Sequence, residues 1–219
     1  MGEPTSRTPK ARDLPGPRRN PSAIGPLFQR IFSLPFRFAL AGLIRTGIRP
    51  WELTMLSLLC SALAAFLIVQ GAWFVPGLLL IPAGVFDVLD GAVARQRGED
   101  SRFGAFLDSS LDRVGDVLLF GAIFWSLADQ GLRLEAGLAL AALVISLGVS
   151  HLRAEGEALG VKVSEGLFQR MERYVALMIG LTAPGAMLPV LAILVGFGGL
   201  TVLQRVGSAW RQLPLREKE

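Results

Sequence analysis

Residues 86–116 read FDVLDGAVARQRGEDSRFGAFLDSSLDRVGD and place five acids at the adjoining ends of two apolar helices. In the first half two aspartates are three residues apart, and in the second half three follow at intervals of four. They are Asp87, Asp90, Asp108, Asp112 and Asp116. Because an α-helix has about 3.6 residues per turn, each set lies along one face of its helix. A short loop joins the helices, so we expect them to run antiparallel with their acidic ends at the same depth.

The sequence around this stretch is apolar enough to lie in a membrane. The 219 residues are 52% hydrophobic, and the mean hydropathy is +0.49. The apolar runs are each close to the roughly 20 residues that a bilayer requires. We therefore predict an all-α integral membrane protein with six transmembrane helices. The predicted spans are residues 52–70, 73–95, 104–127, 134–156, 168–184 and 187–207.

The N-terminal region has a different character. Residues 1–22 are rich in Pro and Arg, which predicts a disordered cytoplasmic tail and not a signal peptide. Residues 23–48 mix Phe, Leu and Ile with arginines, each of which costs about 2.5–3.5 kcal/mol at mid-bilayer. An amphipathic interfacial helix bent at Pro35 is therefore favoured over a seventh span. The six-span domain then covers residues 49–210, and residues 211–219 form a cytoplasmic tail.

The charge distribution predicts the orientation and excludes several classes of protein. Nine Lys and Arg residues precede residue 50, whereas Arg133 alone lies on the opposite side of the predicted bundle. The positive-inside rule places both termini and the acidic helix ends in the cytoplasm. The basic residues flank apolar runs, which suits anionic lipid headgroups and not nucleic acid. With one cysteine, Cys60, and one histidine, His151, an internal disulfide and a His-rich metal site are excluded.

Carboxylates gathered at one membrane depth repel one another, so they must either protonate or be held together by cations. Four unpaired aspartates cost on the order of 10 kcal/mol, which disfavours a purely structural role. Carboxylate oxygens suit hard cations such as Mg²⁺ or Mn²⁺. Two such ions neutralise four charges, and a two-metal site suits in-line displacement at phosphorus.

The spacing of these residues resembles the signature of the CDP-alcohol phosphotransferases, D-G-x2-A-R-x8-G-x3-D-x3-D, with a further Asp three residues earlier. The six-span pattern and the interfacial helix agree with that family along most of the chain. The resemblance implies a membrane enzyme that transfers a phosphatidyl-type group from CDP-diacylglycerol or CDP-archaeol to an alcohol and releases CMP. It also implies a homodimer in the cytoplasmic (plasma) membrane of a prokaryote.

The resemblance further implies a role for each motif residue. Two divalent ions, Mg²⁺ or Mn²⁺, would lie among Asp87, Asp90, Asp108 and Asp112. Asp112 would also be the general base that takes the proton of the acceptor hydroxyl. The CDP pocket would be formed by Gly91, Ala94, Arg95, Gly104 and Thr54. Thr54 ends P-W-E-L-T, where family members often have P-N-x-x-T, so a contact assigned to that Asn has no counterpart here.

Arginines near the join of the predicted fourth and fifth spans point to an acceptor that carries a phosphate, because guanidinium groups bind phosphate through paired hydrogen bonds. They are Arg153, Arg170 and Arg173. Their surroundings, R-A-E-G and R-x-E-R, resemble the phosphatidylinositol phosphate synthase branch and its archaetidylinositol phosphate relative. That resemblance implies inositol 1-phosphate as the acceptor. Each arginine can also be interpreted as a basic residue that flanks an apolar span on its cytoplasmic side, without binding a substrate.

Three alternatives remain. A phosphatidylglycerophosphate synthase would use glycerol 3-phosphate, but such enzymes often have Lys after the fourth Asp, where this chain has Arg113. A divalent-cation transporter would also place acids in membrane helices, although transporters tend to show inverted repeats and sites near the midplane. An inactive scaffold would not need the intact set of aspartates. Metal-dependent release of CMP distinguishes the enzyme from the transporter.

Overall fold

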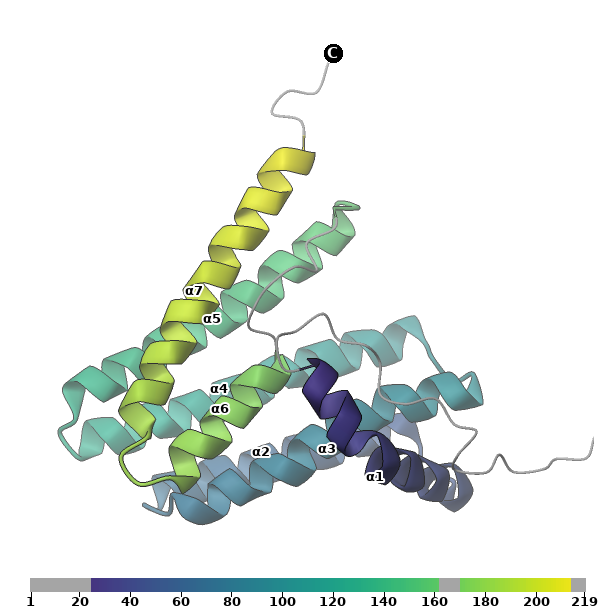
Figure 1. The fold of residues 1–219 in the computed structure, drawn as a ribbon, viewed down its shortest axis with the longest axis horizontal. Coiled ribbons are helices and arrows are strands. Elements are labelled where there is room, and N and C mark those ends of the chain that lie inside the picture. The colour runs from purple at the N-terminus through teal and green to yellow at the C-terminus, as the bar shows by residue number, and fades with distance from the viewer. Residues whose placement is uncertain (1–24, 162–169, 214–219) are drawn as a thin grey trace, which may run out of the picture.

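The computed structural model describes residues 25–161 and 170–213, with side chains from residue 36 onward (Figure 1). The helices are α1 (Gly25–Thr46), α2 (Pro50–Val69), α3 (Phe74–Arg97), α4 (Arg102–Asp129), α5 (Arg133–Ala158), α6 (Arg170–Thr182) and α7 (Met187–Gln212). Within these residues the chain has no strand, which confirms the all-α prediction.

Six of the helices form a closed ring. α2 packs against both α3 and α4, α3 packs against α6, α6 against α7, α7 against α5, and α5 against α4. Among the described residues, no Cα atoms of α3 and α4, or of α4 and α6, approach within 8 Å. Residues on those pairs of helices therefore meet only through side chains that cross the interior of the ring. α1 packs on α3, outside the ring.

The interior of the ring changes character along its length. Towards one end it is filled by apolar side chains, among them Leu119, Ile123 and Leu177. Towards the other end the same helices turn polar: α3 carries its aspartates there, and α6 carries Arg170. Grouping the charged residues at one end lets the other end pack apolar side chains without burying unpaired charges.

Two caps, one at each end of the short turn between α3 and α4, bring the acidic ends of these helices to the same end of the ring. α3 ends at Gly98, whose φ of 65° is in the left-handed region that glycine adopts without strain. Ser101 then begins α4, because its Oγ accepts the N–H of Gly104 at 3.0 Å. With so short a turn, the acidic ends of the two helices lie at the same end of the ring.

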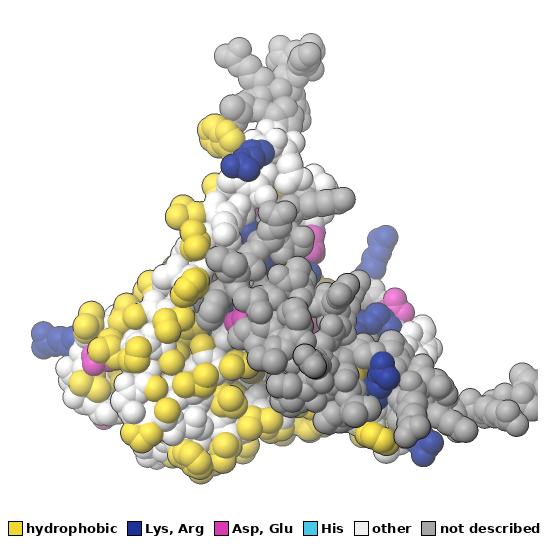
Figure 2. Space-filling view, viewed as in Figure 1, with side chains coloured by type: hydrophobic (Ala, Val, Ile, Leu, Met, Phe, Trp, Pro, Cys, Tyr) yellow, Lys and Arg dark blue, Asp and Glu magenta, His cyan; other side chains and the backbone are white. Residues whose placement is uncertain are grey.

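The surface of the ring is suited to lipid. Four helices, α2, α3, α5 and α7, are long and apolar enough to cross a membrane. Large apolar side chains point outwards, including Leu59 (63% exposed), Val144 (63%) and Leu203 (69%). Figure 2 shows hydrophobic side chains over much of one face. So many exposed apolar groups are unfavourable in water and favourable against lipid tails, and the chain is an integral membrane protein.

Two of the six predicted spans are not confirmed. α4 has 28 residues, but charged groups on its inner face make it too polar to qualify as a span by composition. The described part of α6 has 13 residues, about 20 Å of helix, against about 30 Å of hydrocarbon. The predicted start of this span, at residue 168, lies outside the described residues.

The predicted flanking segments are partly described. α1 runs from Gly25 to Thr46 without a break at Pro35, close to the predicted helix over residues 23–48, and its interfacial position stays a prediction. The predicted tail over residues 1–22 lies outside the described residues. α7 continues to Gln212, so the predicted C-terminal tail begins inside a helix.

Arg97 joins α1 to the ring. Its Nη1 donates to the Ile48 carbonyl at 2.6 Å, and its Nη2 donates to the carbonyls of Leu43 (2.8 Å) and Ile44 (3.1 Å). The last carbonyls of a helix have no intrahelical partner, and a cation there also complements the helix dipole. Arg97 therefore caps α1 from the end of α3.

Replacing Arg97 by Ala should loosen α1, because hydrogen bonds to a charged group contribute about 1.5–3 kcal/mol each. We expect trypsin to cut after Arg45 at least about tenfold faster than in the unmodified protein, measured by gel analysis in detergent micelles. Arg102→Ala, at an exposed arginine that begins α4, is the matched control. Equal cleavage rates in the two variants would contradict this role of Arg97.

Candidate metal centre

Three carboxylates converge inside the ring at its polar end. Asp87 and Asp90 on α3 and Asp108 on α4 each place one oxygen within 4.8 Å of the others. Asp90 is buried, and the other two are half-buried. Asp108 Oδ1 is buried, and no described residue donates a hydrogen bond to it. Clustered carboxylates with an unpaired buried oxygen fit a hard divalent cation such as Mg²⁺ or Mn²⁺.

Asp90 is oriented by a hydroxyl from α2. Thr54 Oγ1 donates to Asp90 Oδ2 at 2.7 Å, and the backbone N–H of Gly91 donates to Asp90 Oδ1. Thr54 is itself buried. Its hydroxyl also lies 3.3 Å from the Pro50 carbonyl, and the predicted contact of Thr54 with the nucleotide stays a prediction. Groups that hold a metal ligand in this way tune both its orientation and its affinity for the metal.

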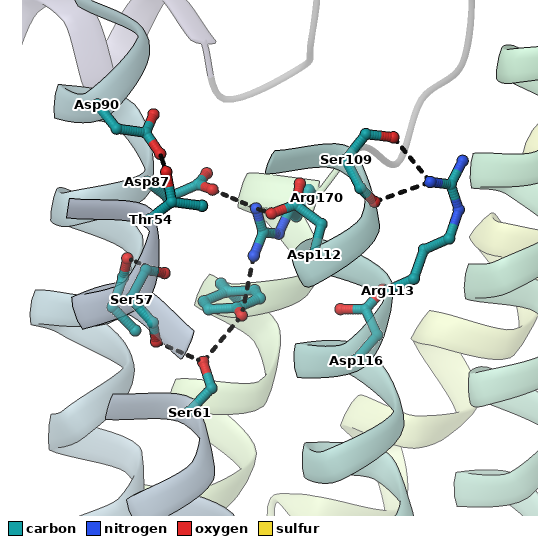
Figure 3. A network of polar contacts seen from close by, with 12 residues as sticks. Thr54, Ser57, Ser61, Asp87, Asp90, Ser109, Asp112, Arg113, Asp116 and Arg170 are labelled. Carbon is teal, nitrogen blue, oxygen red and sulfur yellow. Dashed lines mark hydrogen bonds and ion pairs between the residues drawn. The ribbon is translucent and has the colours of Figure 1, made fainter. Parts of the chain in front are cut away.

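Asp112, the fourth predicted ligand, lies outside this cluster. Its Oδ1 pairs with Arg170 Nη1, and the same nitrogen pairs with Asp87 Oδ1. Figure 3 shows Arg170 on α6 between Asp87 and Asp112. Sequence reasoning assigned Arg170 to the acceptor phosphate and did not foresee this bridge. The ion pairs offset part of the repulsion among the acids.

The other residues predicted to bind the nucleotide lie at the same end of α3 and α4. Arg95 is exposed, Ala94 is half-buried, and a Cβ on Gly91 would come within 3.1 Å of Arg95 Nη1. A Cβ on Gly104 would come within 3.1 Å of Ser101 Oγ, its capping partner. The structure thus shows a helix-capping contact for Gly104, and the nucleotide role of all four residues stays a prediction.

The remaining predicted arginines have separate partners. Arg173 is buried and donates from Nη2 to Asp116 Oδ2 at 3.2 Å. Arg153 is exposed and pairs with Glu157 at 2.8 Å, one turn further along α5. A pair between exposed residues contributes little to stability, so Arg153 remains available for another partner.

Sequence reasoning missed the partners of Asp116. This carboxylate is only 3% exposed, and it accepts a hydrogen bond from Ser146 Oγ on α5 at 2.5 Å besides the one from Arg173. Asp116 thereby joins α4, α5 and α6. Asp116 follows Asp112 by four residues, which predicts that both lie on the same face of the helix. No local pattern indicates its partners Ser146 and Arg173, which are 30 and 57 positions away.

Arg205 was also missed. It lies on α7, is 4% exposed, and donates from Nη1 to the Val149 carbonyl. It is close enough to Arg153 and Arg173 to interact with both electrostatically. An arginine within an otherwise apolar helix was the available signal, because charged residues in membrane helices commonly face the interior and mark function.

Comparison with known proteins agrees with this geometry. Residues 48–204 match the family model described as CDP-alcohol phosphatidyltransferase. The phosphatidylinositol phosphate synthase of Mycobacterium marinum is 36% identical over 141 residues, covering 64% of this chain and 60% of that protein. The archaetidylinositol phosphate synthase of Methanothermobacter thermautotrophicus is 36% identical over 163 residues, covering 70% of this chain and 78% of that protein.

Solved structures agree as well. Mycobacterium tuberculosis phosphatidylinositol phosphate synthase, PgsA1, with CDP-DAG bound superposes with a TM-score of 0.74 at 29% identity. The match covers 83% of this chain and 96% of that chain. The same protein in complex with manganese and citrate gives a TM-score of 0.72 at 29% identity, covering 83% and 91%.

The Thr54 contact predicts an effect on metal binding. Thr54→Val keeps the shape but removes the donor to Asp90, and we expect Mn²⁺ affinity to fall about tenfold, the lower end for groups that hold metal ligands. Electron paramagnetic resonance titration of Mn²⁺ without nucleotide measures it, and Thr54→Ser should restore binding. Unchanged Mn²⁺ affinity in Thr54→Val would show that Thr54 does not support the metal site.

Proposed function

The chain belongs to the CDP-alcohol phosphatidyltransferase family, a family of transferases, and we propose that it moves the phosphatidyl group of CDP-diacylglycerol to inositol 1-phosphate with release of CMP. The observation that carries the reaction is the convergence of Asp87, Asp90 and Asp108 at one end of a membrane-embedded ring. The acceptor is supported by the relatives, which are phosphatidylinositol phosphate and archaetidylinositol phosphate synthases. CDP-archaeol is the corresponding ether-lipid donor.

Two divalent cations, Mg²⁺ or Mn²⁺, are held in this proposal by the three clustered aspartates together with Asp112. Asp112 lies one turn beyond Asp108 on the same face of α4. Bound there, the cations would neutralise the diphosphate of the donor and polarise its phosphorus. The manganese complex of PgsA1 supports a divalent metal in a related protein.

Asp112 is the proposed general base. Its Oδ1 is engaged by Arg170, so the proton of the acceptor hydroxyl passes to Oδ2. The acceptor oxygen then forms a bond to the lipid-linked phosphorus. The bond between that phosphorus and the bridging oxygen of CMP breaks, and CMP leaves with the electron pair. The transfer is direct, because the possible nucleophile Cys60 and base His151 lie on α2 and α5, which do not pack together.

The acceptor phosphate is proposed to bind at Arg153 and Arg173, with Arg205 added by the structure. Arg205 is near enough to Arg153 and to Arg173 to be repelled by each, a phosphate among them would offset this repulsion, and arginine suits a phosphate monoester. Arg170 is assigned to the aspartates, because its guanidinium already bridges two of them. The residues proposed to shape the CDP pocket are Gly91, Ala94, Arg95, Gly104 and Thr54.

The ring also supports a six-span arrangement. α4 lies between α2 and α5, and α6 lies between α3 and α7, and all four of those neighbours qualify as spans. We propose that α4 and α6 cross with them, the charges of α4 facing the interior, and that α1 lies in the interface. The termini and the acidic end then face the cytoplasm of a prokaryotic plasma membrane, in a homodimer.

Glycerol 3-phosphate is the alternative acceptor, since the same arginines would bind its phosphate. The family match does not favour a divalent-cation transporter. An inactive scaffold is disfavoured by the three carboxylates that the fold brings together.

The proposal predicts metal-dependent release of CMP. Purified protein with CDP-diacylglycerol and Mg²⁺ should release CMP with inositol 1-phosphate, but not with glycerol 3-phosphate, inositol or serine. Asp112→Asn should lower kcat at least about 100-fold, as expected for loss of a general base. Asp100→Asn, at an exposed acid in the turn before α4, should leave kcat unchanged.

Each outcome bears on a different part of the proposal. Release with glycerol 3-phosphate instead would keep the chemistry and refute the acceptor. Release with none of the acceptors, from either CDP-diacylglycerol or CDP-archaeol, would refute the enzymatic function.

A further inference from the structure

Tyr174 is a buried residue of α6, one helical turn after Arg170. It is 6% exposed, and its hydroxyl lies 3.2 Å from Ser61 Oγ on α2. The backbone of α4 passes close by, since a Cβ on Gly115 would lie 3.5 Å from the Tyr174 hydroxyl. A ring held on several sides in this way is fixed in position.

Arg170 rests on this ring, one helical turn before it on α6. Its Cζ lies 5.1 Å from the centroid of the Tyr174 ring, within the range of a cation–π interaction. Its Nη2 also donates to the Tyr174 hydroxyl oxygen at 3.3 Å. The other end of the guanidinium, Nη1, pairs with Asp87 and Asp112.

One pattern of hydrogen bonds satisfies the three hydroxyl and guanidinium contacts together. Ser61 Oγ donates its single hydrogen to the Ser57 carbonyl at 3.0 Å. In that pattern the Tyr174 hydroxyl donates to Ser61 Oγ and accepts from Arg170 Nη2. A series of hydrogen bonds thus runs from the guanidinium through Tyr174 and Ser61 to the backbone of α2.

We propose that Tyr174, anchored by Ser61, is a positioning residue that holds the Arg170 guanidinium between Asp87 and Asp112. An arginine side chain has about 2 kcal/mol of rotamer entropy, so a fixed ring and a hydroxyl acceptor are needed to keep it in one place. Asp87 and Asp112 sit on helices that are not neighbours in the ring. Arg170 therefore sets the spacing of these two carboxylates across the interior.

The arrangement also makes Arg170 a competitor of divalent cations for Asp87. While Tyr174 holds the guanidinium in place, Asp87 stays paired with Arg170. Releasing the guanidinium should raise the affinity for divalent metal. It should also disturb the spacing of the two carboxylates and thereby lower kcat. This pattern of opposite changes differs from general damage to the fold, which weakens metal binding and turnover together. The inference rests on the proposed function for its kinetic part only.

The test is Tyr174→Phe, which keeps the ring and removes the hydroxyl. We expect kcat for CMP release to fall about tenfold, the equivalent of about 1.4 kcal/mol for a lost hydrogen bond to a charged group. The KM for inositol 1-phosphate should stay within about twofold, and Mn²⁺ affinity should rise about threefold, by electron paramagnetic resonance titration. Ser61→Ala, which removes the anchor, should change each quantity in the same direction.

Ser57→Ala is the matched control, because it removes a buried hydroxyl from the same helix. The Ser57 hydroxyl donates to the Ala83 carbonyl and takes no part in the hydrogen bonds that link Arg170, Tyr174 and Ser61. It should leave kcat and Mn²⁺ affinity at wild-type values. The proposal is overturned if Tyr174→Phe behaves like Ser57→Ala, or weakens Mn²⁺ binding together with kcat. A raised KM with unchanged kcat would also overturn it, since Arg170 would then serve the acceptor.

The test can still be decided if a variant does not fold or the protein releases no CMP. If Tyr174→Phe does not fold, as judged by thermal unfolding and gel filtration in detergent, Ser61→Ala alone decides. If the unmodified protein releases no CMP, the proposed function fails, and the direction of the Mn²⁺ shift still decides the role of Tyr174.

Discussion

The structure depends on how negative charge is neutralised inside a membrane protein. Asp87, Asp90, Asp108 and Asp112 lie at one end of the ring, and an isolated carboxylate in such surroundings costs several kcal/mol. Each has an arrangement that offsets this cost. Arg170 pairs with two of them, Thr54 donates to a third, and the clustered oxygens present a site for divalent cations.

The closed ring of helices follows from the same constraint. If α3 and α4 packed directly together, their acidic faces would be pressed into contact with no room for a cation or a substrate. α2 packs against both helices and separates them, so the acids meet across an interior that long side chains from α6 enter. The apolar half of the ring supplies the rigid packing, and the polar half supplies the site.

Local patterns predicted a large part of this arrangement, and the rest depends on long-range contacts. The intervals of three and four residues among the aspartates place them on helix faces, because helix periodicity is a property of neighbouring residues. Four of the six predicted spans are long and apolar enough to cross a membrane, whereas α4 carries several charged residues and the described part of α6 is short. No local pattern couples Arg170 to Asp87, 83 positions away, or gives Thr54 a carboxylate as its partner.

The central claim is that the three-aspartate cluster binds a divalent cation, and an anomalous difference map from crystals soaked in Mn²⁺ tests it most directly. The account predicts an anomalous peak about 2.0–2.3 Å from oxygens of Asp87, Asp90 and Asp108, and no such peak in crystals of Asp108→Asn. A map from the unmodified protein with no peak at these carboxylates would contradict the account, because the cluster would then be neutralised by protons and Arg170 alone.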